Sequence, residues 1–406
     1  MKLFAQHGFN KGQKLKQGFE RGLLDGVIFS PKDIALDELT TCLDEIAEKW
    51  PQADRLFDPQ LYASLLANTP GARCGTLLRD YRAYFGPRRR GQLEQETRVV
   101  ADLEAAIRFQ ASLNLTGIIA PNIIIPRSLD SIEAAISKDF LRNVRGVTSK
   151  VKSDLACFAT LSLSHEALRK HDELVEFLSD ITVMDEPPDG FYILVASTGA
   201  GDARYDVFHP DSVAGWMLVN HALTLNGFRV INGYSDIMTP FLGAAGAEAG
   251  ATGWWSNLRS FSLDRFGPEN GGGRLPIPRY LSCALLNRIT FYELENLRRL
   301  VPAVLNNLDT DGLYVSDEHG SEPERNQEVL QTWDAIKKLN KRIAKASAED
   351  ALPVANRAVD AADDTYEVIE ANAIRLDQKS DRSHLEPLRE GLAKFAQLAE
   401  LGSAEE

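Results

Sequence analysis

The hydrophobic residues of this chain fall into eight short runs, each followed by a polar turn and in most cases by a segment with helical spacing. The runs lie at residues 2–8, 26–31, 54–59, 117–125, 155–164, 190–198, 228–236 and 250–257. Short apolar runs without polar alternation are typical of parallel strands buried on both faces, and parallel strands need a crossover between them. Eight consecutive units of this kind predict an α/β fold, the (β/α)8 or TIM-like barrel.

A doubly wound open sheet also alternates strands and helices, so it is the alternative to the barrel. Neither a GxGxxG turn after the first strand nor a GxxxxGK[ST] loop is present, and these phosphate-binding signatures often accompany the open form. Segment 237–248 is rich in glycine and alanine, as expected for a last helix that lies close to the barrel wall. The pattern therefore favours the barrel, and the cofactor stays unknown.

From about residue 276 the pattern predicts helices without further strands. Segment 278–305 is expected to be the eighth barrel helix or its extension, and further helices are predicted at 327–345, 353–372 and 384–401. We divide the chain into a barrel (1–300), with a long basic loop at 60–92, and a C-terminal α-helical extension (301–406). Its narrow apolar stripes need a partner. Either the helices fold back on the barrel as a hairpin, or they bind a partner protein or a second copy in a homo-oligomer.

Charge and composition limit the partners of the chain. Its 406 residues carry a formal net charge of -13, which disfavours indiscriminate binding to nucleic acid or to an anionic membrane. No apolar run is long enough for a membrane span, and the charged start lacks the apolar core of a signal peptide. We therefore expect a cytoplasmic protein without membrane contact.

The sequence contains no strong metal signature. The four cysteines lie far apart, and neither an HxH nor an HExxH pattern is present. A catalytic metal is conceivable but disfavoured, and we assign no metal ligand.

Three side chains at predicted strand ends are candidates for proton transfer or covalent chemistry, because barrel enzymes place reacting groups at the carboxyl ends of strands. His7 ends the first run, and imidazole changes charge near neutral pH. Asp58 in LFDP and Asp236 in NGYSD are carboxylates that can pair across a barrel mouth as base and acid, or as nucleophile and acid. Each has a structural alternative. His7 can hydrogen-bond a loop, and the aspartates can cap the helices that follow them.

Further polar side chains near the predicted mouth are candidates for substrate or phosphate contacts. They are Lys32, Arg79, Arg82, Arg88, Asn122, Asn232, Tyr234, Asn257 and Arg259. For Lys32 the alternative is an ion pair with Asp33, its neighbour in the chain.

The long loop at 60–92 combines arginines with aromatic residues. Tyr81, Tyr84 and Phe85 alternate with the arginines, which suggests phosphate contacts beside stacking surfaces for a nucleotide or nucleic acid. The alternative is a solvated loop whose arginines pair with the acidic body of the protein.

Three functions remain open from these residues. The first is a barrel enzyme, a transferase or hydrolase, that acts on a small anionic, phosphate-bearing or nucleotide-like substrate, for example at a glycosidic bond. The second is a metal-dependent hydrolase that uses the same mouth residues. The third is a non-catalytic barrel that acts as a binding or assembly component through its C-terminal helices.

Overall fold

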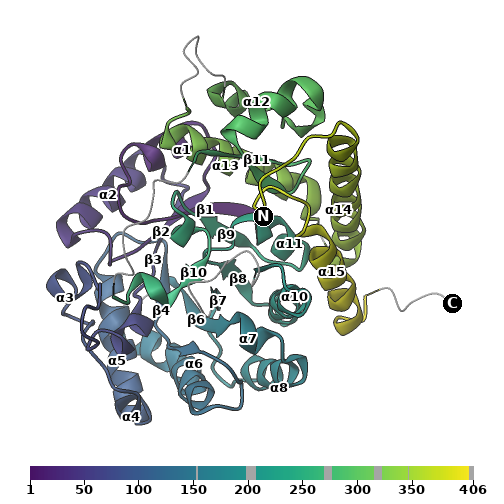
Figure 1. The fold of residues 1–406 in the computed structure, drawn as a ribbon. Helices are drawn as coiled ribbons and strands as arrows, with labels where there is room; N and C mark the ends of the chain where they lie inside the picture. The colour runs from purple at the N-terminus through teal and green to yellow at the C-terminus, as the bar shows by residue number, and fades with distance from the viewer. Residues whose placement is uncertain (152–153, 198–206, 269–276, 315–321, 346, 402–406) are drawn as a thin grey trace.

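The computed structural model describes residues 1–151, 154–197, 207–268, 277–314, 322–345 and 347–401. Within them, eight parallel strands form a barrel that helices surround (Figure 1). The strands are β1 (Lys2–Gln6), β2 (Gly26–Phe29), β3 (Asp54–Phe57), β4 (Gly117–Ala120), β6 (Ala156–Ser164), β7 (Gly190–Ser197), β8 (Arg229–Asn232) and β9 (Ala249–Thr252). Seven of them lie within their predicted runs, and β9 begins one residue before the run predicted at 250–257. Thr198, the last residue of the sixth run, lies outside the described residues.

The strand order distinguishes a barrel from an open sheet. The order is β3-β2-β1-β9-β8-β7-β6-β4, so the first and the eighth barrel strands pair directly, with Phe4 beside Ala251. Between β3 and β4 the barrel is nearly closed. The Thr116 amide donates to the Arg55 carbonyl at 3.0 Å, and the Arg55 amide donates to Thr116 Oγ1 at 2.8 Å. The predicted (β/α)8 fold is confirmed.

Helices follow the barrel strands as predicted, and two short helices also begin within the loop predicted at 60–92. The helices are α1 (Lys14–Glu20), α2 (Leu36–Lys49), α3 (Leu77–Asp80), α4 (Arg90–Leu93), α5 (Glu96–Ala111), α6 (Ile132–Val151), α7 (His165–Leu168), α8 (His171–Thr182), α10 (Pro210–Leu225) and α11 (Thr239–Ala244). The short helix α11 contains Gly243, where close packing leaves no room for a side chain. A Cβ added at Gly243 would lie 2.5 Å from Met1 Sδ and 3.0 Å from Ala344 Cβ, so neighbouring segments approach this helix closely.

The prediction of a helix over 278–305 was wrong for its first half. This part forms an antiparallel hairpin of β11 (Arg279–Ser282) and β12 (Asn287–Thr290), and only then does α12 (Phe291–Leu300) begin. A short apolar segment is compatible with both helical and strand periodicity. Glycine often marks such a turn in a sequence, but here Leu286 adopts the left-handed conformation, with φ 50°.

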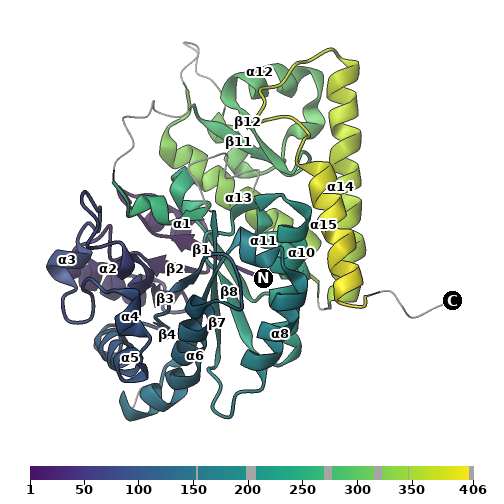
Figure 2. The same cartoon turned by 60° about the horizontal axis from the view of Figure 1, so that its bottom comes forward.

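The helix α13 (Arg325–Ile343) takes the place expected for the eighth barrel helix. It packs against α1 and α11, and the Trp333 indole donates to the Thr252 carbonyl of β9 at 3.2 Å. The helices α14 (Ala348–Ala371) and α15 (Leu385–Leu398) follow, and α15 lies along α10 on the side of the barrel (Figure 2). The described part of the tail therefore packs on the barrel. None of the helices in the described ranges is both long and apolar enough to cross a membrane.

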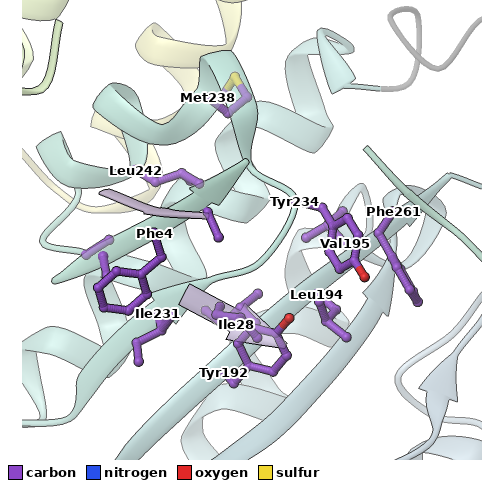
Figure 3. Close-up of a cluster of buried hydrophobic side chains, with 14 of the residues drawn as sticks. Phe4, Ile28, Tyr192, Leu194, Val195, Ile231, Tyr234, Met238, Leu242 and Phe261 are labelled. Atoms are coloured by element: carbon purple, nitrogen blue, oxygen red, sulfur yellow. The ribbon is translucent and has the colours of Figure 1, made fainter. Parts of the chain in front are cut away.

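Apolar side chains from several strands fill the barrel. Figure 3 shows Phe4, Ile28 and Ile231 in this core, and the phenol rings of Tyr192 and Tyr234 lie among the apolar side chains. These tyrosines place hydroxyl groups inside the barrel, and the polar side chains above them form the candidate site.

Candidate functional site

The chain that follows β9 crosses the carboxyl-terminal mouth of the barrel. Within this segment, β10 (Phe261–Ser262) pairs with Ala196–Ser197 at the end of β7. Leu258, Phe261 and Phe266 in the same segment are buried. The segment 256–266 therefore covers the mouth and separates the polar side chains below it from solvent.

Arg265, which sequence reasoning missed, is at the centre of these buried side chains. Its side chain is 3% exposed, and its guanidinium donates to Asp33 Oδ2 at 2.6 Å and to the Tyr234 hydroxyl at 2.5 Å. Asp33 also accepts from Ser30 Oγ at 3.0 Å. The sequence offers little signal for Arg265, because it lies among ordinary loop residues and only the crossing segment brings it over the barrel. We call Arg265, Asp33, Tyr234 and Asp58 the inner cluster.

Asp58 lies fully buried at the end of β3. Its carboxylate accepts from the Tyr62 hydroxyl at 2.8 Å and from the Gln60 amide at 3.0 Å. Burial raises the pKa of Asp58 to about 6, although the hydrogen bonds from Tyr62 and Gln60 and the charge of Arg265 act in the opposite direction. Asp58 can therefore bind or release a proton close to neutral pH.

His7 lies in an apolar environment beside the inner cluster. Its ring centroid is 5.2 Å from that of Phe29 and 5.8 Å from that of Trp254. Burial lowers the pKa of His7 to about 3, and Nδ1 has no hydrogen-bond partner among the described residues. The imidazole is therefore neutral at physiological pH in this conformation.

This burial makes the stability of the protein depend on pH. A histidine in the unfolded chain titrates near 6.5, so below that pH the unfolded state gains a proton that folded His7 does not accept until about pH 3. The linked stability is present above pH 6.5 and is lost as the pH falls, by about 3 kcal/mol at pH 4.5. In the variant His7→Gln we expect a drop in unfolding free energy between pH 7 and 4.5 that is smaller by this amount, measured by urea unfolding.

A second variant repeats the test at an independent site. His165 is also buried, and burial lowers its pKa to about 3. His165→Gln should therefore reduce the acid sensitivity in the same direction. Equal drops in the parent and both variants would contradict a neutral, buried state of these rings.

A cavity of about 250 Å³ opens beside the inner cluster. Its charged lining consists of Arg259, Arg279, Arg288, Lys379 and one carboxylate, Asp236. Its remaining lining is Val207, Phe208, Trp216, Tyr234, Ser235, Ile237, Ser256, Ser260, Leu286 and Asn287. We call this space the outer cavity. The loop after β8, the crossing segment, the β11–β12 hairpin and the connection between α14 and α15 all contribute to it.

The carboxylate of the outer cavity is held in the ionised form. Arg288 donates to both oxygens of Asp236, at 2.5 and 2.8 Å, and Thr252 Oγ1 donates at 2.7 Å. Burial by itself would raise the pKa of Asp236, but the charge and hydrogen bonds of Arg288 outweigh it and the pKa is lowered. The partners of the Asp236 carboxylate among the described residues are therefore Arg288 and Thr252, and not the backbone amides that a helix cap would bind.

The other two arginines of the outer cavity are also paired. Arg259 contacts Glu328 at 3.0 Å, and Arg279 contacts Asp377 at 3.1 Å. An arginine has five N–H donors, so one carboxylate partner leaves donors for a ligand. These ion pairs orient the guanidinium groups and leave some of their N–H donors available.

The backbone after β8 is strained where it forms the cavity wall. Tyr234 and Asp236 have positive φ values of 52° and 41°, which side chains other than glycine rarely adopt. The Ser235 amide anchors this turn by donating to the Ala251 carbonyl at 2.9 Å. Such strain persists where surrounding structure enforces it, often at functional sites. Here it directs Tyr234 toward Arg265 and Asp236 toward Arg288.

Several predicted binding residues lie in packing contacts instead. Asn122 donates to Ser137 Oγ and to the Thr160 carbonyl, and Asn232 exchanges hydrogen bonds with Asn220 of α10. Lys32 forms the ion pair that is its structural alternative, with its Nζ 3.5 Å from Asp33 Oδ1. Asn257 is exposed on the crossing segment. Of the candidates named from sequence, the structure brings together Tyr234, Asp236 and Arg259 in the outer cavity.

The basic loop does not present the predicted stacking surface. Tyr81, Tyr84 and Phe85 are buried, and the rings of the two tyrosines pack against Phe57 and Phe109. The predicted stacking surface was wrong, because these aromatic side chains pack into the main hydrophobic core against β3 and α5.

The arginines of the same loop form local contacts. Exposed Arg79 pairs with Asp80, Arg82 donates to the Leu78 carbonyl, and Arg88 donates to both oxygens of buried Asp102 at 2.9 Å. None of the three lines the outer cavity.

Among the described residues, no group of three histidine, cysteine, aspartate or glutamate side chains lies close enough together to hold a metal ion. The alternative of a metal-dependent hydrolase therefore gains no candidate ligand set in this part of the chain. No protein-family model matches this sequence, and no curated protein matches it. The functional argument accordingly depends on the geometry of the outer cavity and the inner cluster.

Proposed function

We propose that this chain is a barrel enzyme, a transferase or hydrolase, that binds a phosphate-bearing substrate in the outer cavity. The observation that carries the proposal is the lining of that cavity, in which three arginines and a lysine accompany a single ionised carboxylate, Asp236, which follows the carboxyl end of β8. Barrel enzymes place their substrates at this end of the strands. The fold alone supports many chemistries, so the charges of the site select the substrate class.

The arginines suit a phosphate in particular. Guanidinium groups match the geometry of phosphate oxygens and bind them with charge-assisted hydrogen bonds. Arg288 uses its terminal nitrogens on Asp236, while its buried Nε has no hydrogen-bond partner among the described residues. Lys379 is exposed, lines the cavity and supplies a further positive charge. The substrate anion therefore binds between these groups, close to Asp236.

Two carboxylates in different environments provide the acid–base chemistry. Asp236 stays ionised beside Arg288, whereas burial lets Asp58 hold a proton up to about pH 6. A pair of carboxyl groups whose pKa values are driven apart is a common arrangement for a base or nucleophile with an acid. We assign the first role to Asp236, which lines the cavity. Asp58 lies in the inner cluster and does not line the outer cavity. Its charge contributes to the raised pKa of the Tyr234 hydroxyl, and through Tyr234, which lines the cavity, it acts on the substrate.

The C-terminal extension contributes directly to this proposed site. Lys379 comes from the connection between α14 and α15, and Asp377 and Ser380 in the same connection hold Arg279. We therefore give the extension a part in substrate binding.

Lysine variants test the proposal without disturbing a buried contact. Lys379→Gln removes a positive charge from the outer cavity, and we expect phosphate esters to bind about five- to tenfold more weakly as a result, as for the loss of a charge-assisted contact. Binding is measured by the rise in Tm with inorganic phosphate, pyrophosphate and ribose 5-phosphate. The matched control is Lys345→Gln, at another exposed position that does not line this cavity.

The outcomes separate a specific site from general charge effects. The proposal requires that Lys345→Gln bind like the parent while Lys379→Gln binds more weakly. If none of the phosphate compounds raises the Tm of the parent protein, or if both variants lose affinity equally, the outer cavity is not a phosphate site.

A further inference from the structure

A second, larger cavity lies next to the outer cavity. It has a volume of about 700 Å³ and lies between the start of α10 and the segment that leads into α15. Its lining is Phe208, His209, Pro210, Asp211, Gln378, Asp381, Ser383, His384, Pro387, Glu390 and Lys394. Phe208 lines both cavities, and Gln378 in this cavity is the chain neighbour of Lys379 in the outer one. The two cavities therefore adjoin along one groove.

The charges change sign along this groove. The outer cavity has four cationic side chains and one carboxylate, whereas the second has three carboxylates, Asp211, Asp381 and Glu390, against one lysine. That lysine, Lys394, is already paired with Asp211 at 2.7 Å. The second cavity therefore offers acceptors for hydrogen-bond donors and disfavours a second phosphate.

The second cavity also has apolar walls that suit a flat ring. Phe208, Pro210 and Pro387 line it, and the Phe208 ring lies 5.3 Å from the His384 ring. Aromatic and proline surfaces bind the faces of planar ligands, while carboxylates at the edge accept from their amino groups.

On this basis we infer that the substrate is a mononucleotide whose base carries an exocyclic amino group, with the phosphate in the outer cavity and the base in the second. The inference rests on the proposed phosphate site and adds the substrate class. Size supports it, because about 250 Å³ is below the range of roughly 300–1,000 Å³ that is usual for ligand pockets, and the adjoining space supplies the rest. A long nucleic acid fits less well, since the net charge of -13 opposes many phosphate contacts.

Calorimetric titration of the full chain with AMP, CMP, UMP and ribose 5-phosphate tests the inference. We expect AMP and CMP, which carry exocyclic amino groups, to bind about tenfold more tightly than ribose 5-phosphate or UMP. Glu390→Ala should reduce this preference by about three- to tenfold and leave the affinity for ribose 5-phosphate unchanged. The matched control is Glu386→Ala, one turn earlier in α15, whose side chain is 75% exposed and does not line the groove.

The outcomes distinguish the base subsite from the phosphate site. If ribose 5-phosphate binds as tightly as AMP and CMP, or if Glu390→Ala and Glu386→Ala keep the same preference as the parent, the base subsite is wrong and the phosphate site stands. If none of the four compounds binds, the phosphate site is wrong and the inference fails with it.

Discussion

Replacing Arg265 with methionine is expected to lower the free energy of unfolding by about 3–5 kcal/mol, the usual cost of removing one partner from a buried ion pair. The guanidinium is almost fully buried and contacts both Asp33 and Tyr234. Methionine fills a similar volume but leaves the Asp33 carboxylate with Ser30 and Lys32 alone, and it leaves the Tyr234 hydroxyl without its donor. Urea unfolding at pH 7 measures the change.

Two further variants separate charge from geometry. Arg265→Lys keeps the charge but loses the forked donor, so its stability should lie between those of the parent and Arg265→Met. The matched control is Arg142→Met on α6, where the side chain is 60% exposed and pairs only weakly with Asp139. This change should stay within about 0.5 kcal/mol of the parent. A similarly small effect of Arg265→Met would show that the inner cluster does not hold the crossing segment in place.

The barrel was predictable because each strand is short, buried on both faces and followed by a crossover. Phe4, Ile28 and Ile231 lie in apolar runs that no exposed strand would tolerate. The C-terminal region does not repeat this combination of signals. Tyr280 and Ile289 are buried in a hairpin whose apolar spacing also fits a helix, and the left-handed Leu286 gives no glycine to mark the turn.

The candidate site was predictable only for residues at strand ends. Tyr234 and Asp236 lie just after β8, and Arg259 lies in the segment that follows β9, so the barrel geometry places them at the mouth. The partners of these residues come from elsewhere. Arg288 and Lys379 belong to the hairpin and to the C-terminal connection, and their approach depends on tertiary packing that no local pattern encodes. The ion pair of Arg88 could not be predicted for the same reason, because its buried partner Asp102 lies on α5.

The pair of Asp236 and Arg288 should show strong coupling in a double-mutant cycle. Arg288→Met leaves a buried carboxylate without its counter-charge and should lower the unfolding free energy by about 3–5 kcal/mol. Asp236→Asn keeps the backbone conformation, since asparagine tolerates positive φ, and should cost about 1–3 kcal/mol. The double variant should be more stable than the sum of the single effects predicts, by at least about 2 kcal/mol. Additive effects would contradict a direct interaction.

The pH dependence and the ligand response of the same variants decide why the pair is present. Because Arg288 lowers the pKa of Asp236, the stability that it contributes is present above pH 4 and is lost as the pH falls below the unfolded value of 3.8. The double variant should lack this acid loss, stay folded at pH 7 and no longer gain Tm from phosphate compounds. Buried ion pairs can often be replaced without loss of stability. A folded double variant that has lost phosphate binding would show that the pair serves the ligand, whereas undiminished binding would remove Arg288 from the proposed site.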